Sequence, residues 1–138
     1  MQEYSRGAVI FKKFKSGYKV LLIKQINGNW GFPKGHMEDN ETDYDTAKRE
    51  IFEETSLTEV KLFDYSYESN YQLANGNNKN VKYFLAYDYG KKQPRKQESE
   101  LLKLRYYPIS RAINVLTFKT SKQILKNAWI DFKKCTIS

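Results

Sequence analysis

The chain has 138 residues, 40% of them apolar, a length that suits one compact domain burying roughly two-thirds of its unfolded surface. No apolar run approaches the ~18 residues of a membrane span, and the first residues lack the pattern of a signal peptide, so we expect a soluble, cytoplasmic protein. The single cysteine, Cys135, and the single histidine, His36, exclude an internal disulfide and zinc sites built on several such ligands.

The sequence carries 24 lysines and arginines against 16 carboxylates, and its net charge of +8 has two interpretations. A positive field concentrates anions near the surface, which favours nucleotides or nucleic acid as partners. A lysine-rich proteome would produce the same excess without a specific partner, and the lysines are spread along the chain. The densest basic cluster lies in residues 91–96.

The N-terminal quarter predicts strands. Residues 7–11 and 18–23 are rich in β-branched side chains, and the turn residues 15–17 between them favour a hairpin. Two glycines and a proline in residues 30–35 then predict irregular backbone beside a short strand.

The pattern becomes helical over residues 43–55. Tyr44, Ala47 and Ile51 recur at three- and four-residue spacing, so we expect them to form the buried stripe of this helix.

The remainder predicts further strands and two helices. The expected strands are residues 59–67, 81–87 and 104–109, followed by a short helix capped by Ser110 and a last helix starting at Ser121. Strands, one helix, more strands and final helices favour a mixed sheet with helices on its faces.

Three glutamates on the first helix carry the strongest chemical pattern. Glu50, Glu53 and Glu54 stand at positions i, i+3 and i+4, so their like charges share one helix face and repel one another. A hard divalent cation with oxygen ligands would offset this repulsion. An ordinary solvated acidic face, with Arg49 offsetting Glu53 one turn later, would do so without a ligand.

The residues around this helix resemble the signature of the Nudix hydrolases, which act on nucleoside diphosphates linked to another moiety. The matching string is Gly35-x5-Glu41-x7-Arg49-Glu50-Ile51-x-Glu53-Glu54-x-Ser56-Leu57, which agrees at eight of nine defined positions. The exception is Ser56, because the family usually has glycine there to end the helix in a left-handed conformation. Serine at this position should cost stability rather than chemistry.

The resemblance implies a role for each matching residue. Glu50, Glu53 and Glu54 look like the carboxylates that hold Mg²⁺, with Mn²⁺ as a substitute, and one of them would also activate the attacking water. Arg49 resembles the arginine that orients these glutamates, and Glu41 the outer glutamate that supports the site.

Two further metal contacts are implied by the same resemblance. The backbone carbonyl of Lys34, just before the glycine of the signature, is often a metal ligand. Glu100 resembles a late glutamate that supports the metal or acts as a base in many members.

The segment before the signature is similar to one subgroup of the family. Residues 30–36 resemble the W-x-x-P-K-G-H sequence of asymmetrical dinucleoside tetraphosphate hydrolases. By this resemblance Lys34 and His36 would stabilise charge on the phosphates; the alternative for His36 is a histidine satisfied within a turn, which its place beside the signature disfavours.

The same subgroup suggests where a nucleobase would bind. Tyr71 resembles the tyrosine that stacks on adenine, and either Lys82 or Tyr83 would face the site from the next strand. Phe118 could supply the second face of an adenine sandwich. Stacking of a base on an aromatic ring tolerates any base identity.

The resemblance implies an α+β fold, an α/β/α sandwich with a mixed β-sheet between helices, and a single domain over residues 1–138. The expected activity is metal-dependent hydrolysis of phosphoanhydride bonds, most specifically cleavage of diadenosine tetraphosphate to ATP and AMP. We expect a nucleoside polyphosphate substrate, no membrane partner, and a monomer or weak dimer.

Three alternatives remain at this point. An RNA 5′-end pyrophosphohydrolase would use the same glutamates on a triphosphorylated RNA, and the basic residues 91–96 favour it. A nucleoside triphosphate sanitiser usually lacks the Pro-Lys-Gly-His stretch. A nucleotide-binding domain without catalysis is disfavoured by the retained glutamates.

Overall fold

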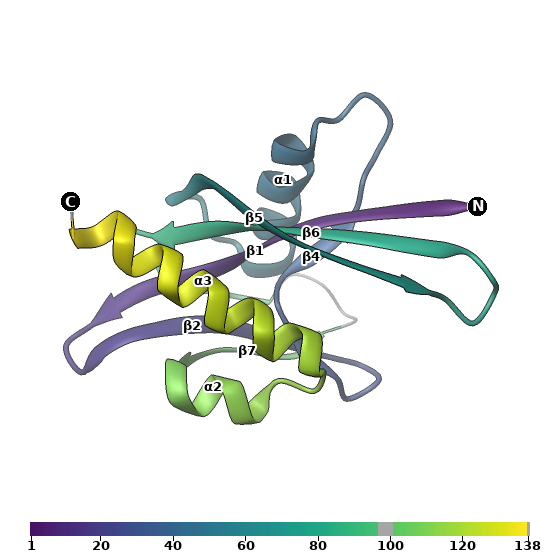
Figure 1. Ribbon diagram of the computed structural model, residues 1–138. Coiled ribbons are helices and arrows are strands. Elements are labelled where there is room, and N and C mark those ends of the chain that lie inside the picture. The colour runs from purple at the N-terminus through teal and green to yellow at the C-terminus, as the bar shows by residue number, and fades with distance from the viewer. Residues whose placement is uncertain (97–100, 138) are drawn as a thin grey trace.

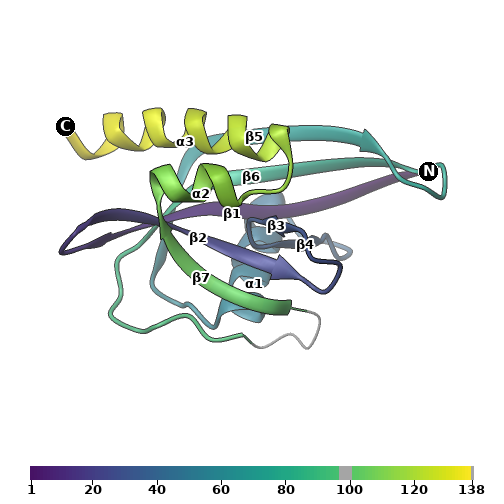
Figure 2. The same ribbon diagram turned by 90° about the horizontal axis from the view of Figure 1, so that it is seen from below.

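The computed structural model describes residues 1–96 and 101–137. A seven-stranded sheet lies between α1 on one face and α2 and α3 on the other (Figures 1 and 2). The strands are β1 (Gln2–Phe14), β2 (Gly17–Gln25), β3 (Trp30–Gly31), β4 (Lys34–His36), β5 (Val60–Gln72), β6 (Asn78–Asp88) and β7 (Leu101–Pro108). The helices are α1 (Asp43–Thr55), α2 (Ile109–Val115) and α3 (Lys119–Ile137). Among the described residues, no helix is long and apolar enough to cross a membrane.

The sheet is mixed, as the element order predicts. β1 pairs parallel with β6 and antiparallel with β2 and β4. β5 pairs antiparallel with β6, while β3 and β7 pair antiparallel with β2. The expected hairpin between the first two strands and the α+β class are therefore confirmed.

The strand alternation divides the core between the two faces of the sheet. Phe11 points to the larger apolar cluster, where its ring stacks on Phe132 of α3 with centroids 4.8 Å apart. Its neighbour Ile10 points the other way, to the smaller cluster that Ile51 of α1 completes. Because successive strand side chains face opposite sides, β1 anchors helices on both faces of the sheet.

Helix α1 has the predicted bounds, but its buried stripe is shorter than expected. Ala47 and Ile51 are buried, whereas Tyr44 is 46% exposed and its ring lies edge-to-face with that of Phe84. The expectation that Tyr44 belongs to the core is wrong, because the N-terminal end of α1 extends past the strands (Figure 1).

The two C-terminal helices begin earlier than predicted. Pro108 occupies the N-cap position of α2, so Ser110 lies inside the helix and does not cap it. A proline presets the backbone angle φ for the start of a helix without a side-chain hydrogen bond. Similarly, α3 begins at Lys119, and Ser121 lies within its first turn.

The end of α1 adopts the left-handed conformation that the sequence predicts. Ser56 has φ = 66°, and its hydroxyl donates a hydrogen bond of 2.9 Å to the carbonyl oxygen of Arg95. Glycine tolerates this conformation better than any residue with a Cβ atom.

We therefore expect Ser56→Gly to be more stable than Ser56→Ala by about 1 kcal/mol, since both lose the hydroxyl and only alanine keeps the unfavourable backbone angle. Urea denaturation of the two variants measures the difference directly. Equal stability would show that the conformation costs nothing here.

Candidate active site

Two cavities lie side by side where β2, β3 and β4 meet α1 and the start of α3. The acidic cavity has a volume of about 450 Å³ and is lined by the glutamates of α1. The aromatic cavity has a volume of about 510 Å³ and is lined by rings from β3, β5, β6 and the segment before α3. Gln25, Asn27 and Lys34 line both, so the two cavities adjoin along these residues.

Arg49 organises the acidic cavity. Its Nε lies 2.7 Å from Glu41, and its Nη1 lies 2.9 Å from Glu50 and 3.1 Å from Glu53. Its Nη2 donates a hydrogen bond of 2.8 Å to the carbonyl oxygen of His36. Hydrogen bonding to Glu41, then to Glu53 and Glu50, outweighs burial and raises the pKa of the guanidinium. One cation thus offsets the repulsion among the carboxylates.

Glu41 holds Arg49 in place from outside the cavity. Its carboxylate also accepts hydrogen bonds from the backbone N–H of Glu38 and the hydroxyl of Thr46, both at 2.9 Å. The bonds from Arg49, followed by that from Glu38, lower the pKa of Glu41 to about 2. Glu41 is therefore ionised throughout the neutral range.

The depressed pKa predicts how acid affects stability. The pKa of Glu41 falls from 4.5 to about 2 on folding. The stabilisation that the ionised Glu41 gives the folded protein is therefore complete above pH 4.5 and is lost as the pH drops toward 2. We expect Glu41→Gln to be less stable than the natural protein at neutral pH, with the difference shrinking through this window. Denaturant unfolding of both proteins across this pH range measures it, and a pH-independent difference would contradict the account.

Backbone around Lys34 and Gly35 positions the two innermost glutamates. Glu54 is 8% exposed and accepts a hydrogen bond of 2.8 Å from the backbone N–H of Lys34. The carboxylate of Glu50 lies so close to Gly35 that a Cβ atom there would collide with it. A side chain at Gly35 would therefore displace the Glu50 carboxylate from its present position beside Arg49.

Basic groups border the same cavity. Burial lowers the pKa of the Lys34 ammonium, an effect that the charges of Glu54 and Glu50 oppose. The Nδ1 atom of His36 lies 3.4 Å from the ammonium of Lys79, a residue only 5% exposed. Burial, followed by the charge of Lys79, lowers the pKa of His36. Sequence reasoning did not single out Lys79, because one lysine among many carries no local signal and only the pairing of β6 with β1 brings it here.

The aromatic cavity brings together three residues predicted to contact the base. Tyr71 from β5, Tyr83 from β6 and Phe118 before α3 all line it. Tyr83 is buried and packs its ring edge-to-face with Phe32 at 5.2 Å, while Tyr71 and Phe118 are about half exposed. Trp30, the first residue of the W-x-x-P-K-G-H stretch, lines the same cavity.

Of the two residues predicted to face the site from β6, only Tyr83 does so. Lys82 points to the opposite face of the sheet, where its ammonium lies 3.0 Å from Asp43. Asp43 also bonds Arg6 at 2.7 Å, and although its burial favours the neutral acid, the bonds from Arg6 and Lys82 prevail and lower its pKa. The alternation of side chains along the strand makes Lys82 an anchor for the start of α1.

The donor chemistry of the acidic cavity fits a hard divalent cation. Glu50, Glu53 and Glu54 line one hollow together with Arg49 and Lys34, and carboxylate oxygens are the ligands that such a cation prefers. Across residues 1–96 and 101–137, no three acidic, cysteine or histidine side chains converge on one point. The Nη1 atom of Arg49 bonds the carboxylates of both Glu50 and Glu53. Glu100, predicted as a further ligand, lies outside the described residues.

The chain matches the family model of the NUDIX domain over residues 3–127. It is 33% identical over 84 residues to the asymmetrical bis(5′-nucleosyl)-tetraphosphatase of Caenorhabditis elegans, an alignment that covers 58% of this chain and 61% of that enzyme. It is 31% identical over 132 residues to the m7GpppN-mRNA hydrolase of Saccharomyces cerevisiae, covering 94% of this chain and 11% of the yeast enzyme. The chain thus spans less than two-thirds of either relative.

The fold agrees with that of a solved relative. A crystal structure of a C. elegans Ap4A hydrolase binary complex superposes with a TM-score of 0.86 at 23% identity, covering 96% of this chain and 98% of the other. The mixed sheet, with α1 on one face and α2 and α3 on the other, is therefore the fold of that protein.

Proposed function

The chain belongs to the Nudix hydrolase family, and from this we propose that it hydrolyses a phosphoanhydride bond of diadenosine tetraphosphate, releasing ATP and AMP. The observation that carries the proposal is the junction at Lys34 between an aromatic and an acidic cavity. One cavity suits a nucleobase and the other suits the reacting end of a polyphosphate. The similarity to an asymmetrical tetraphosphatase supports this choice of substrate.

The aromatic cavity would hold an adenine. Tyr71 and Phe118 present half-exposed rings, and Tyr83 closes the buried end. A base stacked on one aromatic ring gains about 1–3 kcal/mol.

We therefore expect Tyr71→Ala to raise KM for diadenosine tetraphosphate by about tenfold to a hundredfold, with a smaller effect on kcat, because stacking stabilises bound substrate and transition state alike. Steady-state kinetics separate the two constants. Tyr71→Phe serves as the matched control, since it keeps the ring and should keep KM within about twofold. An unchanged KM in Tyr71→Ala would place the base elsewhere.

The polyphosphate would run from the aromatic cavity past Lys34. Lys34 lines both cavities, and His36 lines the acidic one. These groups would stabilise negative charge that shifts toward the departing phosphate oxygen as the bond breaks.

The carboxylates of Glu50, Glu53 and Glu54 and the backbone carbonyl of Lys34 would hold Mg²⁺ or Mn²⁺. Such an ion, when bound, neutralises phosphate charge and lowers the pKa of a coordinated water. Arg49 would orient two of these carboxylates through the bonds of its Nη1 atom to Glu50 and Glu53.

The reaction itself needs a base. A water oxygen forms the new bond to a phosphorus of the bridge, one of the glutamates takes the proton of that water, and the P–O bond to the departing nucleotide breaks. Glu54 is well placed to keep a fixed orientation, because the N–H of Lys34 binds its carboxylate and little of it is exposed.

A second candidate is removal of pyrophosphate from a triphosphorylated RNA 5′ end. The net charge of +8 and the similarity to a yeast mRNA hydrolase favour it. Both substrates would use the same glutamates, so site chemistry alone does not separate them.

A side-by-side assay separates the two. Purified protein with Mg²⁺ receives diadenosine tetraphosphate in one reaction and 5′-triphosphorylated RNA in another, and anion-exchange chromatography resolves the products. We expect kcat/KM to be much higher for the dinucleotide. A higher value for RNA would transfer the function to RNA 5′-end processing, and tight nucleotide binding without turnover of either would contradict both.

A further inference from the structure

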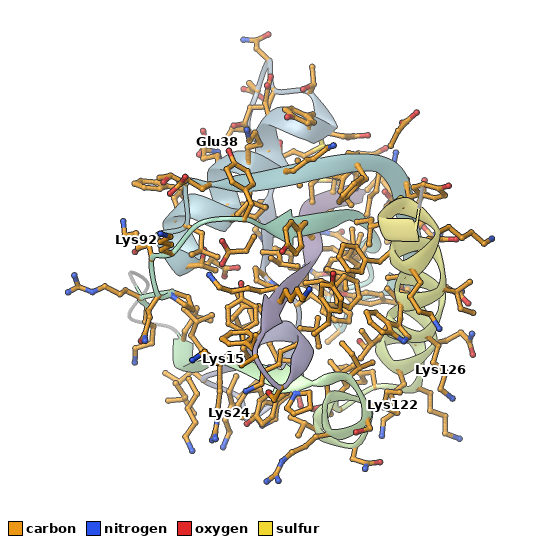
Figure 3. The ribbon with its side chains drawn as sticks, turned by 90° about the vertical axis from the view of Figure 1, so that its left-hand side faces the viewer. Lys15, Lys24, Glu38, Lys92, Lys122 and Lys126 are labelled. Carbon is orange, nitrogen blue, oxygen red and sulfur yellow. The ribbon has the colours of Figure 1, made fainter. Side chains whose placement is uncertain are left out.

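The positive charge of this protein is concentrated in part of the fold. Eleven of its 16 carboxylates lie in residues 38–68, and residues 4–37 contain none. From Leu101 to the C-terminus there are eight lysines and arginines against one carboxylate, Asp131. In Figure 3, the labelled Lys15, Lys24, Lys122 and Lys126 lie in the lower half of the view, below Lys92 and Glu38.

Three cations lie close together on β2 and β7, on the same face of the sheet as Tyr107. The Cα atoms of Lys24 and Lys103 are direct partners across the two strands, and Arg105 follows two residues later on the same face of β7. Directly opposed like charges on neighbouring strands destabilise a sheet. Within the described chain, no carboxylate lies at ion-pair distance from any of the three. We call Lys24, Lys103 and Arg105 the basic track.

The basic track begins at the rim of the aromatic cavity. Trp30 lines that cavity, and its Cα is the partner of Lys24 on the other side of β2. The Trp30 ring also packs edge-to-face on Tyr107 at 5.5 Å, and the guanidinium of Arg105 lies 5.3 Å from the centre of the Tyr107 ring. A chain leaving the cavity over Trp30 would therefore meet the three cations next.

We propose that the basic track binds the phosphate backbone of a single-stranded RNA whose 5′ nucleotide occupies the two cavities. The inference rests on the proposed function in that the site accepts a nucleoside polyphosphate. An RNA that keeps the triphosphate of its first nucleotide carries a nucleoside polyphosphate at its 5′ end. Exposed aromatic rings combined with a run of Lys and Arg are the features that bind single strands without sequence preference.

The chemistry of this face favours RNA over a membrane or an apolar protein partner. Lys103 and Arg105 are exposed, and the exposed apolar side chain of β7, Leu102, alternates to the opposite face. Phosphate contacts position a nucleic acid but carry no sequence information. The three cations would make contacts of this kind.

The test compares two triple variants with the same loss of charge. The first is Lys24→Gln, Lys103→Gln and Arg105→Gln. The control is Lys15→Gln, Lys48→Gln and Lys61→Gln, three exposed lysines in the β1–β2 turn, in α1 and in β5. Fluorescence anisotropy measures binding of a 3′-labelled, 5′-triphosphorylated RNA of about twelve nucleotides at several salt concentrations. Thermal melting verifies that both variants fold.

We expect the basic-track variant to bind RNA at least tenfold more weakly. The slope of log K against log salt should fall by about two, because about 0.7 counterions are released per phosphate neutralised on a single strand. The control should stay within about twofold of the natural protein. Equal affinity and equal salt slope in the two triple variants would overturn the proposal.

Hydrolysis of diadenosine tetraphosphate by the same proteins keeps this proposal separate from the proposed function. We expect both triple variants to retain the kcat/KM of the natural protein, because none of the six residues lines either cavity among the described residues. Loss of dinucleotide hydrolysis in the basic-track variant would show that these residues serve the hydrolytic site itself, and would contradict a separate track. Absence of hydrolysis in the natural protein would overturn the proposed function while the RNA comparison stands.

Discussion

Glu54→Gln is expected to lower kcat for diadenosine tetraphosphate by about a hundredfold to ten-thousandfold, the range that a positioned acid–base group contributes. Glutamine keeps the shape of the side chain and can still accept the hydrogen bond from the N–H of Lys34. It cannot take a proton or supply an anionic oxygen, so the loss should appear in turnover and leave the fold intact. Single-turnover kinetics with excess enzyme measure the chemical step alone.

Glu53→Gln should have a comparable effect, although its carboxylate is more exposed and bonds Arg49 at 3.1 Å. The matched control is Glu38→Gln, which removes a carboxylate that lies 3.7 Å from the same guanidinium and is mostly exposed. Glu38→Gln should retain most of the activity. If activity survived both Glu53→Gln and Glu54→Gln while thermal melting showed native folds, the glutamate mechanism would be wrong.

Gly7→Ala should cause the largest loss of stability among single conservative changes. A Cβ atom on Gly7 would collide with the carbonyl oxygen of Pro33 and stand 2.7 Å from the Cα of Lys34. Both are backbone neighbours that can move only by displacing β4 from β1, where Gly7 pairs with Lys34. Overpacking of this kind costs about 1–3 kcal/mol or more. Urea denaturation measures the loss.

Gly31→Ala is the matched control, because a Cβ at Gly31 meets no atom within 4 Å. It should change the free energy of unfolding by less than about 0.5 kcal/mol. Activity adds a second readout, since displacement of Lys34 would also disturb the hydrogen bond to Glu54 and lower kcat in the protein that still folds. Equal stability of the two variants would mean that β4 is not held against β1 as described.

Residue spacing along the chain was enough to predict helix α1, because the interactions that form it connect residues close in sequence. The bounds of α1 were predicted from helical periodicity, and the structure adds a capping box at Thr42 and Asp45 and a left-handed residue at Ser56. The pairing of Arg49 with Glu53 follows from helical spacing, and the structure contains it. Even here, the exposure of Tyr44 depends on how far α1 extends past the sheet, which helical periodicity does not encode.

Other features depend on pairing between distant strands. Lys79 reaches His36 only because β1 and β6 run parallel, and Lys24 meets Lys103 only because β7 pairs with β2. In a chain with 24 lysines and arginines, neither position differs locally from its neighbours. The choice between Lys82 and Tyr83 likewise required the register of β6, since a shift of one residue exchanges the two faces.

The most direct test of the central claim is the product pattern of diadenosine tetraphosphate hydrolysis with Mg²⁺ and with excess chelator. Chromatography of the nucleotides should show ATP and AMP in equal amounts when Mg²⁺ is present, and unchanged substrate when it is removed. This result would establish asymmetrical, metal-dependent cleavage at the glutamates of α1. Release of two ADP molecules, or equal turnover in the presence of chelator, would contradict it.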